Sequence, residues 1–227
     1  MNIELMCRPA STVARLTLSD RETVTCEVGA MIAMSDGLSV ETTSRSRGGS
    51  GGFLKGVSRI FSGESYFLNH FHASREGAEL IIGPTLMGDI VHHTLMGGSL
   101  IVQGSSWLAS GPGVEIDTTF QGISNALFSG ESVFWVRCRG RGDLLLNSFG
   151  AIYNIDVDDE YVVDTGHIVA YEDTLSFSMS KASESLLGSL LGGEGLVCRF
   201  KGRGRIYCQS HNPPSFGAAL GSKLSPR

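Results

Sequence analysis

Short stretches in which apolar and polar residues alternate recur along this chain of 227 residues, and turn residues separate them. Alternation with a period of two is typical of a β-strand that buries one face. Thirty glycines against six prolines indicate many tight turns, as in an all-β protein. Helical spacing is sparse, and we expect only single helical turns in the glycine-containing stretches at 51–63, 120–130 and 183–193.

A longer repeat in the sequence extends over several of these predicted strands. Residues 128–148 (FSGESVFWVRCRGRGDLLLNS) align without gaps on residues 190–210 (LLGGEGLVCRFKGRGRIYCQS), a shift of 62 positions, and their apolar phase, glycines and basic residues agree. A third copy begins upstream, because FSGES at 61–65 recurs at 128–132. The alignment predicts three copies of one structural unit.

A second element repeats in the same order. The stretches MIAMSDGLSV (31–40), WLASGPGVEI (107–116) and IVAYEDTLSF (168–177) share an aliphatic second residue, an alanine third residue and apolar residues at positions eight and ten. One such unit buries too little surface to be stable alone, so we expect the units to share a core.

The predicted fold is therefore all-β, with three β-sandwich or double-stranded β-helix-like repeats packed in one compact unit. The single domain spans 1–227. Its repeats are expected at about 3–82, 83–148 and 149–212, followed by a C-terminal tail at 213–227.

The triplet Arg141-Gly142-Asp143 has the sequence that adhesion receptors recognise. In the alignment, its counterpart in the third copy is Arg203-Gly204-Arg205. Because a basic residue replaces the aspartate at the equivalent place, we interpret the triplet as the turn of a hairpin whose glycines supply positive φ.

Basic residues on equivalent strands are the main candidate for a binding surface, because side chains two apart share a strand face. The set consists of Arg137, Arg139, Arg141, Arg199, Lys201, Arg203 and Arg205, and His70 and His72 take matching places in the first copy. On a chain of net charge −5, this stripe of cations can bind an anionic partner or protect a strand edge from aggregation. The second interpretation is favoured, since aromatic residues for base stacking are few among these positions.

Catalytic motifs are missing from the sequence. It contains no GxSxG elbow, no P-loop and no GxGxxG before a helix, so no catalytic residue is assigned. His70 and His72 have a spacing that can bind metal, but no further ligands stand at credible positions. We expect no metal and no cofactor, and a metal-dependent cupin-like enzyme is the least favoured alternative.

The five cysteines form no CxxC pair, and their odd number favours free thiols in a reducing compartment. Cys138 and Cys208 fall on the strand face opposite to the basic residues, so we expect them to be buried and unreactive. The opening MNIELMCRPA has neither a basic start nor an unbroken apolar run, and no stretch of about 18 apolar residues could span a membrane. A cytoplasmic location is expected.

Four stretches carry a resemblance to a known family: FSGES, GRGDLLLNSFGAI, DTGHIVAYEDTL and GRGRIYCQSHNP, which lie within about residues 3–215. The chain resembles the family of altered inheritance of mitochondria protein 24, whose prokaryotic members are uncharacterised. The resemblance implies a fold related to the tryptophan RNA-binding attenuation protein, with β-sandwich units in chains that assemble into rings, above all trimers. It carries over no catalytic, tryptophan-binding or RNA-binding residue.

Together these observations favour a non-enzymatic scaffold or binding module with an unknown ligand. We expect a homo-oligomer, a trimer above all, with an unknown protein partner. Binding of RNA, or of another anionic partner such as a lipid headgroup, through the cationic stripe is the alternative.

Overall fold

The computed structural model describes residues 1–46, 65–117, 135–181 and 196–224. The helical turns expected at 51–63, 120–130 and 183–193 lie outside these described residues.

In chain order the strands are β1 (Asn2–Met6), β2 (Val13–Leu18), β3 (Thr23–Glu27), β4 (Met31–Met34), β5 (Leu38–Ser46), β6 (Ser65–Ala73), β7 (Ala78–Ile82), β8 (Ile90–Gln103), β9 (Trp107–Ser110), β10 (Val114–Asp117), β11 (Trp135–Asn147), β12 (Ile152–Val157), β13 (Glu160–Asp164), β14 (Ile168–Glu172), β15 (Ser176–Lys181), β16 (Leu196–Lys201) and β17 (Gly204–Gln209). Short 3-10 turns, η1 (Gly104–Ser106) and η2 (Thr165–His167), precede β9 and β14, and helix α3 (Pro213–Gly221) follows β17.

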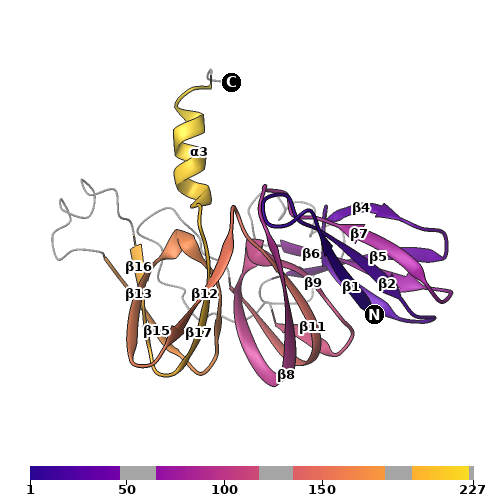
Figure 1. Cartoon of the computed structure of the whole chain (residues 1–227), viewed down its shortest axis with the longest axis horizontal. Helices are drawn as coiled ribbons and strands as arrows, with labels where there is room; N and C mark the ends of the chain where they lie inside the picture. The colour runs from indigo at the N-terminus through magenta and orange to yellow at the C-terminus, as the bar shows by residue number, and fades with distance from the viewer. Residues whose placement is uncertain (47–64, 118–134, 182–195, 225–227) are drawn as a thin grey trace.

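The fold is mostly β and contains three antiparallel sheets. One sheet has the order β1-β2-β7-β4, and another has the order β13-β16-β15. The large sheet runs β12-β17-β14-β8-β11-β9-β3-β6-β5, with β10 paired to β11. The strands form layers that follow one another in a row along the long axis of the molecule. The N-terminal strands lie at one end of this row and the C-terminal strands at the other (Figure 1).

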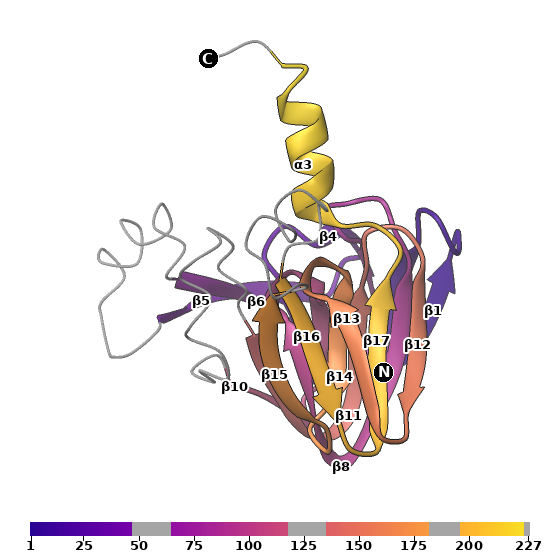
Figure 2. The ribbon, with the colours of Figure 1, turned by 90° about the vertical axis from the view of Figure 1, so that its left-hand side faces the viewer.

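The C-terminal end of the row is a β-sandwich. The strands β12, β17 and β14 lie in the large sheet, and β13, β16 and β15 form the second layer. The pairs β12 and β13, β14 and β15, and β16 and β17 each divide between the two layers (Figure 2). Cys198, Phe200 and Ile206 belong to the buried core of this sandwich.

The N-terminal end is built in the same manner. The strands β2, β7 and β4 form one layer, while β3, β6 and β5 belong to the large sheet. Strand β2 shows why the sequence folds this way, because Ala14, Leu16 and Leu18 are buried while the residues between them are only partly covered. The same buried cluster contains Phe71 of β6 and Leu80 of β7.

The middle of the row uses two long strands in place of four short ones. Strands β8 and β11 pair along their whole length, with a register shift between Arg139 and Arg141. Strand β9 pairs with the second half of β11, and β10 pairs with its first half. Trp107 is fully buried in the core of this region, as its apolar phase predicts, and Trp135 is buried in the C-terminal core.

Three strands carry a bulge at their second residue. The extra residue is Ile32 in β4, Leu108 in β9 and Val169 in β14, where the pairing with β7, β11 and β17 shifts register. A bulge re-aims the side chain of the extra residue and increases the local twist.

The interpretation of Arg141-Gly142-Asp143 as a hairpin turn is wrong. The triplet lies inside β11, and its aligned counterpart begins at the corner between β16 and β17, which belong to different sheets, and continues into β17. The chain turns a corner between layers at both places, so no hairpin forms. Gly140 has φ +118°, and a Cβ there would lie 2.3 Å from the carbonyl oxygen of Gly113, so the corner requires glycine.

The expectation of buried thiols is confirmed. Cys138 and Cys208 are fully buried, and all five cysteines are free, with only Cys7 exposed. Burial raises the pKa of the Cys138 thiol to about 12, so the reactive thiolate is scarce at neutral pH.

The predicted C-terminal tail contains a helix. Asn212 caps α3 by accepting a hydrogen bond from the backbone N–H of Ser215, and Phe216 packs against Phe149 with a centroid distance of 5.1 Å. The helix has no buried residue and extends away from the strands (Figure 2). No helix among the described residues is long and apolar enough to cross a membrane.

Glu27 on β3 generates a pH-dependent prediction. Burial raises the pKa of its carboxyl from 4.5 to about 7. Since the folded-state pKa lies above the unfolded value, the ionised form opposes folding, and stability falls as pH rises between these values. We expect Glu27→Gln to raise the free energy of unfolding by roughly 1–3 kcal/mol at pH 8 and to leave it unchanged at pH 4. Urea unfolding at both pH values measures this, with the exposed Glu79→Gln as control, and an equal effect at both would contradict the prediction.

Candidate functional site

The predicted cationic stripe lies on two neighbouring parts of the row. Arg137 and Arg139 lie on the first half of β11, and Arg141 follows the register shift. Arg199 and Lys201 lie on β16, Arg203 lies in the corner that follows, and Arg205 lies on β17. The structure therefore divides the seven residues between the middle of the row and its C-terminal end.

Six of these seven cations form ion pairs with carboxylates. The pairs are Arg137 with Asp173 (3.7 Å), Arg139 with Glu115 (2.9 Å), Arg199 with Glu160, Lys201 with Glu160 (2.9 Å), Arg203 with Asp158 (2.7 Å) and Arg205 with Asp156 (2.8 Å). Arg141 forms no ion pair with a described residue. Most of the charge of the stripe is thus neutralised at short range.

The register of the strands produces this neutralisation. Arg139 lies directly opposite Glu115 on β10, and Arg205 lies directly opposite Asp156 on β12. The Arg139 guanidinium donates two hydrogen bonds to Glu115, at 3.1 and 2.9 Å, and this contact raises the pKa of Arg139. These pairs are exposed to solvent, where ion pairs contribute little to stability, so their main effect is on the surface potential.

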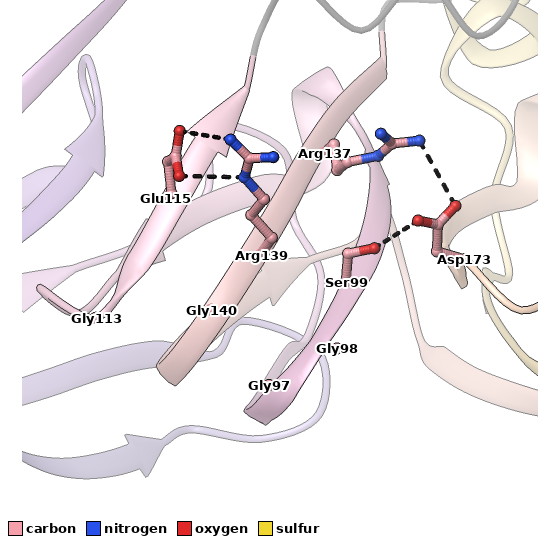
Figure 3. A pocket seen from close by; sticks show the side chains of 9 residues that line it. All are labelled: Gly97, Gly98, Ser99, Gly113, Glu115, Arg137, Arg139, Gly140 and Asp173. Atoms are coloured by element: carbon pink, nitrogen blue, oxygen red, sulfur yellow. Dashed lines mark hydrogen bonds and ion pairs between the residues drawn. The ribbon is translucent and has the colours of Figure 1, made fainter.

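A groove of about 570 Å³ lies along the first half of the stripe, where Arg137 and Arg139 line it (Figure 3). Its lining consists of Gly97, Gly98, Ser99, Gly113, Glu115, Arg137, Arg139, Gly140 and Asp173. The Ser99 hydroxyl donates to Asp173 at 2.6 Å, and Asp173 also faces Arg137. The two guanidinium groups lie between the two carboxylates, so the groove can exchange hydrogen bonds with a polar ligand but offers no net positive charge (Figure 3).

The histidine pair lies on β6 in a network of threonines. His70 Nδ1 lies 3.0 Å from the Thr25 hydroxyl and its Nε2 lies 2.8 Å from the Thr43 hydroxyl, while His72 Nδ1 lies 3.0 Å from the Thr23 hydroxyl. Both ring nitrogens of His70 are therefore occupied by hydrogen bonds. Across the described ranges, no group of three or more histidine, cysteine, aspartate or glutamate side chains could hold a metal ion.

One buried charge was missed by the sequence analysis. Asp89 accepts two hydrogen bonds from Arg8, at 3.0 and 2.8 Å, and one from the Thr12 hydroxyl at 2.6 Å. Burial acts to raise the pKa of Asp89, but these bonds and the backbone N–H of Ile90 outweigh it and hold the pKa below its usual value. Asp89 precedes β8, so the contact ties the N-terminal sheet to the middle of the row and is structural.

Two known proteins are similar to this chain, one in sequence and one in structure. The uncharacterised protein M6_Spy0233 of Streptococcus pyogenes serotype M6 is 28% identical over 212 residues, which cover 92% of this chain and 85% of that protein. The crystal structure of protein SPYM3_0169 from Streptococcus pyogenes superimposes with a TM-score of 0.76 at 24% identity, covering 98% of this chain and 99% of that one. This second likeness shows that the two chains share a fold.

The family comparison agrees with the resemblance found in the sequence. The model of the family described as mitochondrial biogenesis AIM24 matches residues 3–211, which is nearly the whole chain. The chain therefore belongs to the AIM24 family.

Proposed function

We propose that this chain is a non-enzymatic homo-oligomeric scaffold or binding module, built from three β-sandwich repeats and assembled as a trimer. The observation that carries the proposal is the recurrence of one pattern of strand pairing. In one layer the sets are β2-β7-β4, β8-β11-β9 and β12-β17-β14, and in the other they are β3-β6-β5, β8-β11-β10 and β13-β16-β15.

The bulges support the same proposal. Ile32, Leu108 and Val169 each occupy the second position of the stretches that repeat in the sequence. A bulge is a specific local feature, and three at one aligned position argue for a common unit. The repeats would then span about 3–82, 83–148 and 149–212.

Exposed apolar side chains support assembly. Met31, Ile32 and Met34 on β4 are exposed at one end of the row, and Tyr161 and Val162 on β13 are exposed at the other. Apolar strand edges of this kind are typical of surfaces that associate with another chain. The free thiols support a reducing compartment such as the cytoplasm.

Binding of RNA or of a lipid headgroup is the weaker candidate. The ion pairs to Glu115, Glu160 and Asp173 compete with any phosphate that would approach the stripe. A phosphate would have to displace these carboxylates or approach beside them, and both routes weaken the attraction.

Sizing tests the main proposal. We expect multi-angle light scattering to give about three times the chain mass of 24.2 kDa at all but the lowest protein concentrations, because the apolar ends bury each other. A mass equal to a single chain at high concentration would contradict the proposal.

A charge series tests the alternative. We expect the unmodified protein to show little binding to polyuridylate or to vesicles of anionic lipid at low salt. Replacing Glu115, Glu160 and Asp173 with their amides should create binding that weakens steeply with added salt, because unpaired guanidinium groups would then face solvent. Fluorescence anisotropy and vesicle sedimentation measure this, with the exposed Glu79→Gln, whose carboxylate forms no ion pair with a described residue, as the control. Tight salt-sensitive binding by the unmodified protein, lost on replacing Arg137, Arg139, Lys201 and Arg203 with serine, would favour the alternative instead.

A further inference from the structure

The chain contains two junctions between consecutive units, and both use the same strand pairing. At the first, β3 pairs with β9, and Cys26 lies opposite Ala109. At the second, β8 pairs with β14, and Val102 lies opposite Ala170. Ala109 and Ala170 are both the third residue of the repeated stretch, so the two junctions have one register.

Each junction therefore needs two edges, and among the described strands one edge of each kind has no strand partner. In the first unit, the residue aligned with Ala109 and Ala170 is Ala33 on β4. In the third unit, the residue equivalent to Cys26 and Val102 is Val163 on β13. The three residues are equivalent because they lie opposite aligned positions of β6, β11 and β16. Both β4 and β13 end their sheets.

The bulge residues show how a completed junction is packed. Leu108, from the second unit, is fully buried in the core of the first, and Val169, from the third unit, is fully buried in the core of the second. The aligned residue Ile32 is 58% exposed. Ile32 thus has the position and chemistry of a core residue but no core to enter.

The β13 edge likewise exposes apolar residues whose counterparts are buried at an internal junction. Leu100 and Ile101 of β8 are buried where that strand meets β14. Their counterparts on β13 are Tyr161 and Val162, which are 45% and 43% exposed. At the internal junction β14 covers the apolar edge of β8, whereas the corresponding apolar edge of β13 is open.

The charges at the two open edges are complementary. Across the second junction, Arg137 forms an ion pair with Asp173. The aligned residues are Arg199, beside β13 on β16, and Asp36, which follows β4 by two residues. The open edges therefore carry residues aligned with both halves of this ion pair, and Arg199 would contact Asp36 of the second copy in addition to Glu160 of its own chain.

We propose that the β4 edge of one copy pairs antiparallel with the β13 edge of a second copy, with Ala33 opposite Val163 and Met34 opposite Val162. The proposal rests on the proposed assembly and names its contact surface. A chain cannot join its own two edges, because β4 and β13 lie at opposite ends of the row (Figure 1). The contact joins two different surfaces, so repeating it continues the series of units from copy to copy until a ring closes. In this arrangement Ile32 enters the core of the neighbouring C-terminal sandwich.

Cysteine crosslinking tests the register. In a Cys7→Ser background, which removes the exposed native thiol, we expect the pair Met34→Cys and Val162→Cys in one chain to give covalent ladders on mild oxidation. A ring of three copies limits the ladder to a trimer on a non-reducing gel. The matched control pairs Met34→Cys with Tyr153→Cys, which is as exposed but lies on the unused edge of β12, and it should give no ladder.

A charge placed in the edge tests the contact independently. Val162→Asp should weaken association at least about 100-fold, because the carboxylate would be buried against β4. The exposed Val40→Asp on β5 should leave the mass unchanged, and circular dichroism should show both variants folded.

The two proposals fail in different ways. A protein that light scattering shows to be oligomeric, but in which the test pair gives no ladder and Val162→Asp keeps the mass, would overturn this interface and leave the assembly standing. A single chain at high concentration would overturn both.

Discussion

The structure depends on the pairing of β9 with β3 and of β14 with β8, at which a bulge residue of β9 or β14 enters the buried core of the preceding part of the chain. Strand β9 joins β3, and β14 joins β8, so the large sheet runs from the N-terminal strands to the C-terminal ones. Leu108 and Val169 are fully buried at these joints. A sandwich of three-stranded layers has a small interior, and sharing apolar residues across the joint enlarges it. These two joints therefore enlarge the buried core and connect the N-terminal strands to the C-terminal ones.

The same constraint explains which strand edges are left open. A row built from directional joints always ends in two unlike edges, and these carry apolar side chains suited to a joint. Exposed β edges invite association, and proteins usually protect them with charges or bulges. Here the bulge at Ile32 presents an apolar side chain, and the edge at Val162 is apolar as well. The surface chemistry at the ends thus follows from the packing chemistry at the joints, and this is the basis of the proposed self-association.

The sequence alone was enough to predict the mostly β class and the buried positions of Cys138 and Cys208. Those features depend on alternation along one strand, which is local. The ion pairs of the basic residues were not predicted, because Glu115 faces Arg139 only through the pairing of β10 with β11. The glycines at 140 and 142 do permit a bend, as predicted, but nothing local distinguishes a hairpin from a corner between layers. The contact of Arg8 with Asp89 joins residues 81 apart and has no sequence signature.

Hydrogen–deuterium exchange of the unmodified protein, followed by mass spectrometry across a dilution series, is the most direct test of the joint. If β4 and β13 take part in a third joint between copies, their amides will exchange as slowly as those of β9 and β14 at high concentration. They will then lose that protection together on dilution, while β9 and β14 keep theirs. Fast exchange of β4 and β13 at every concentration, beside slow exchange of β9 and β14, would contradict the account.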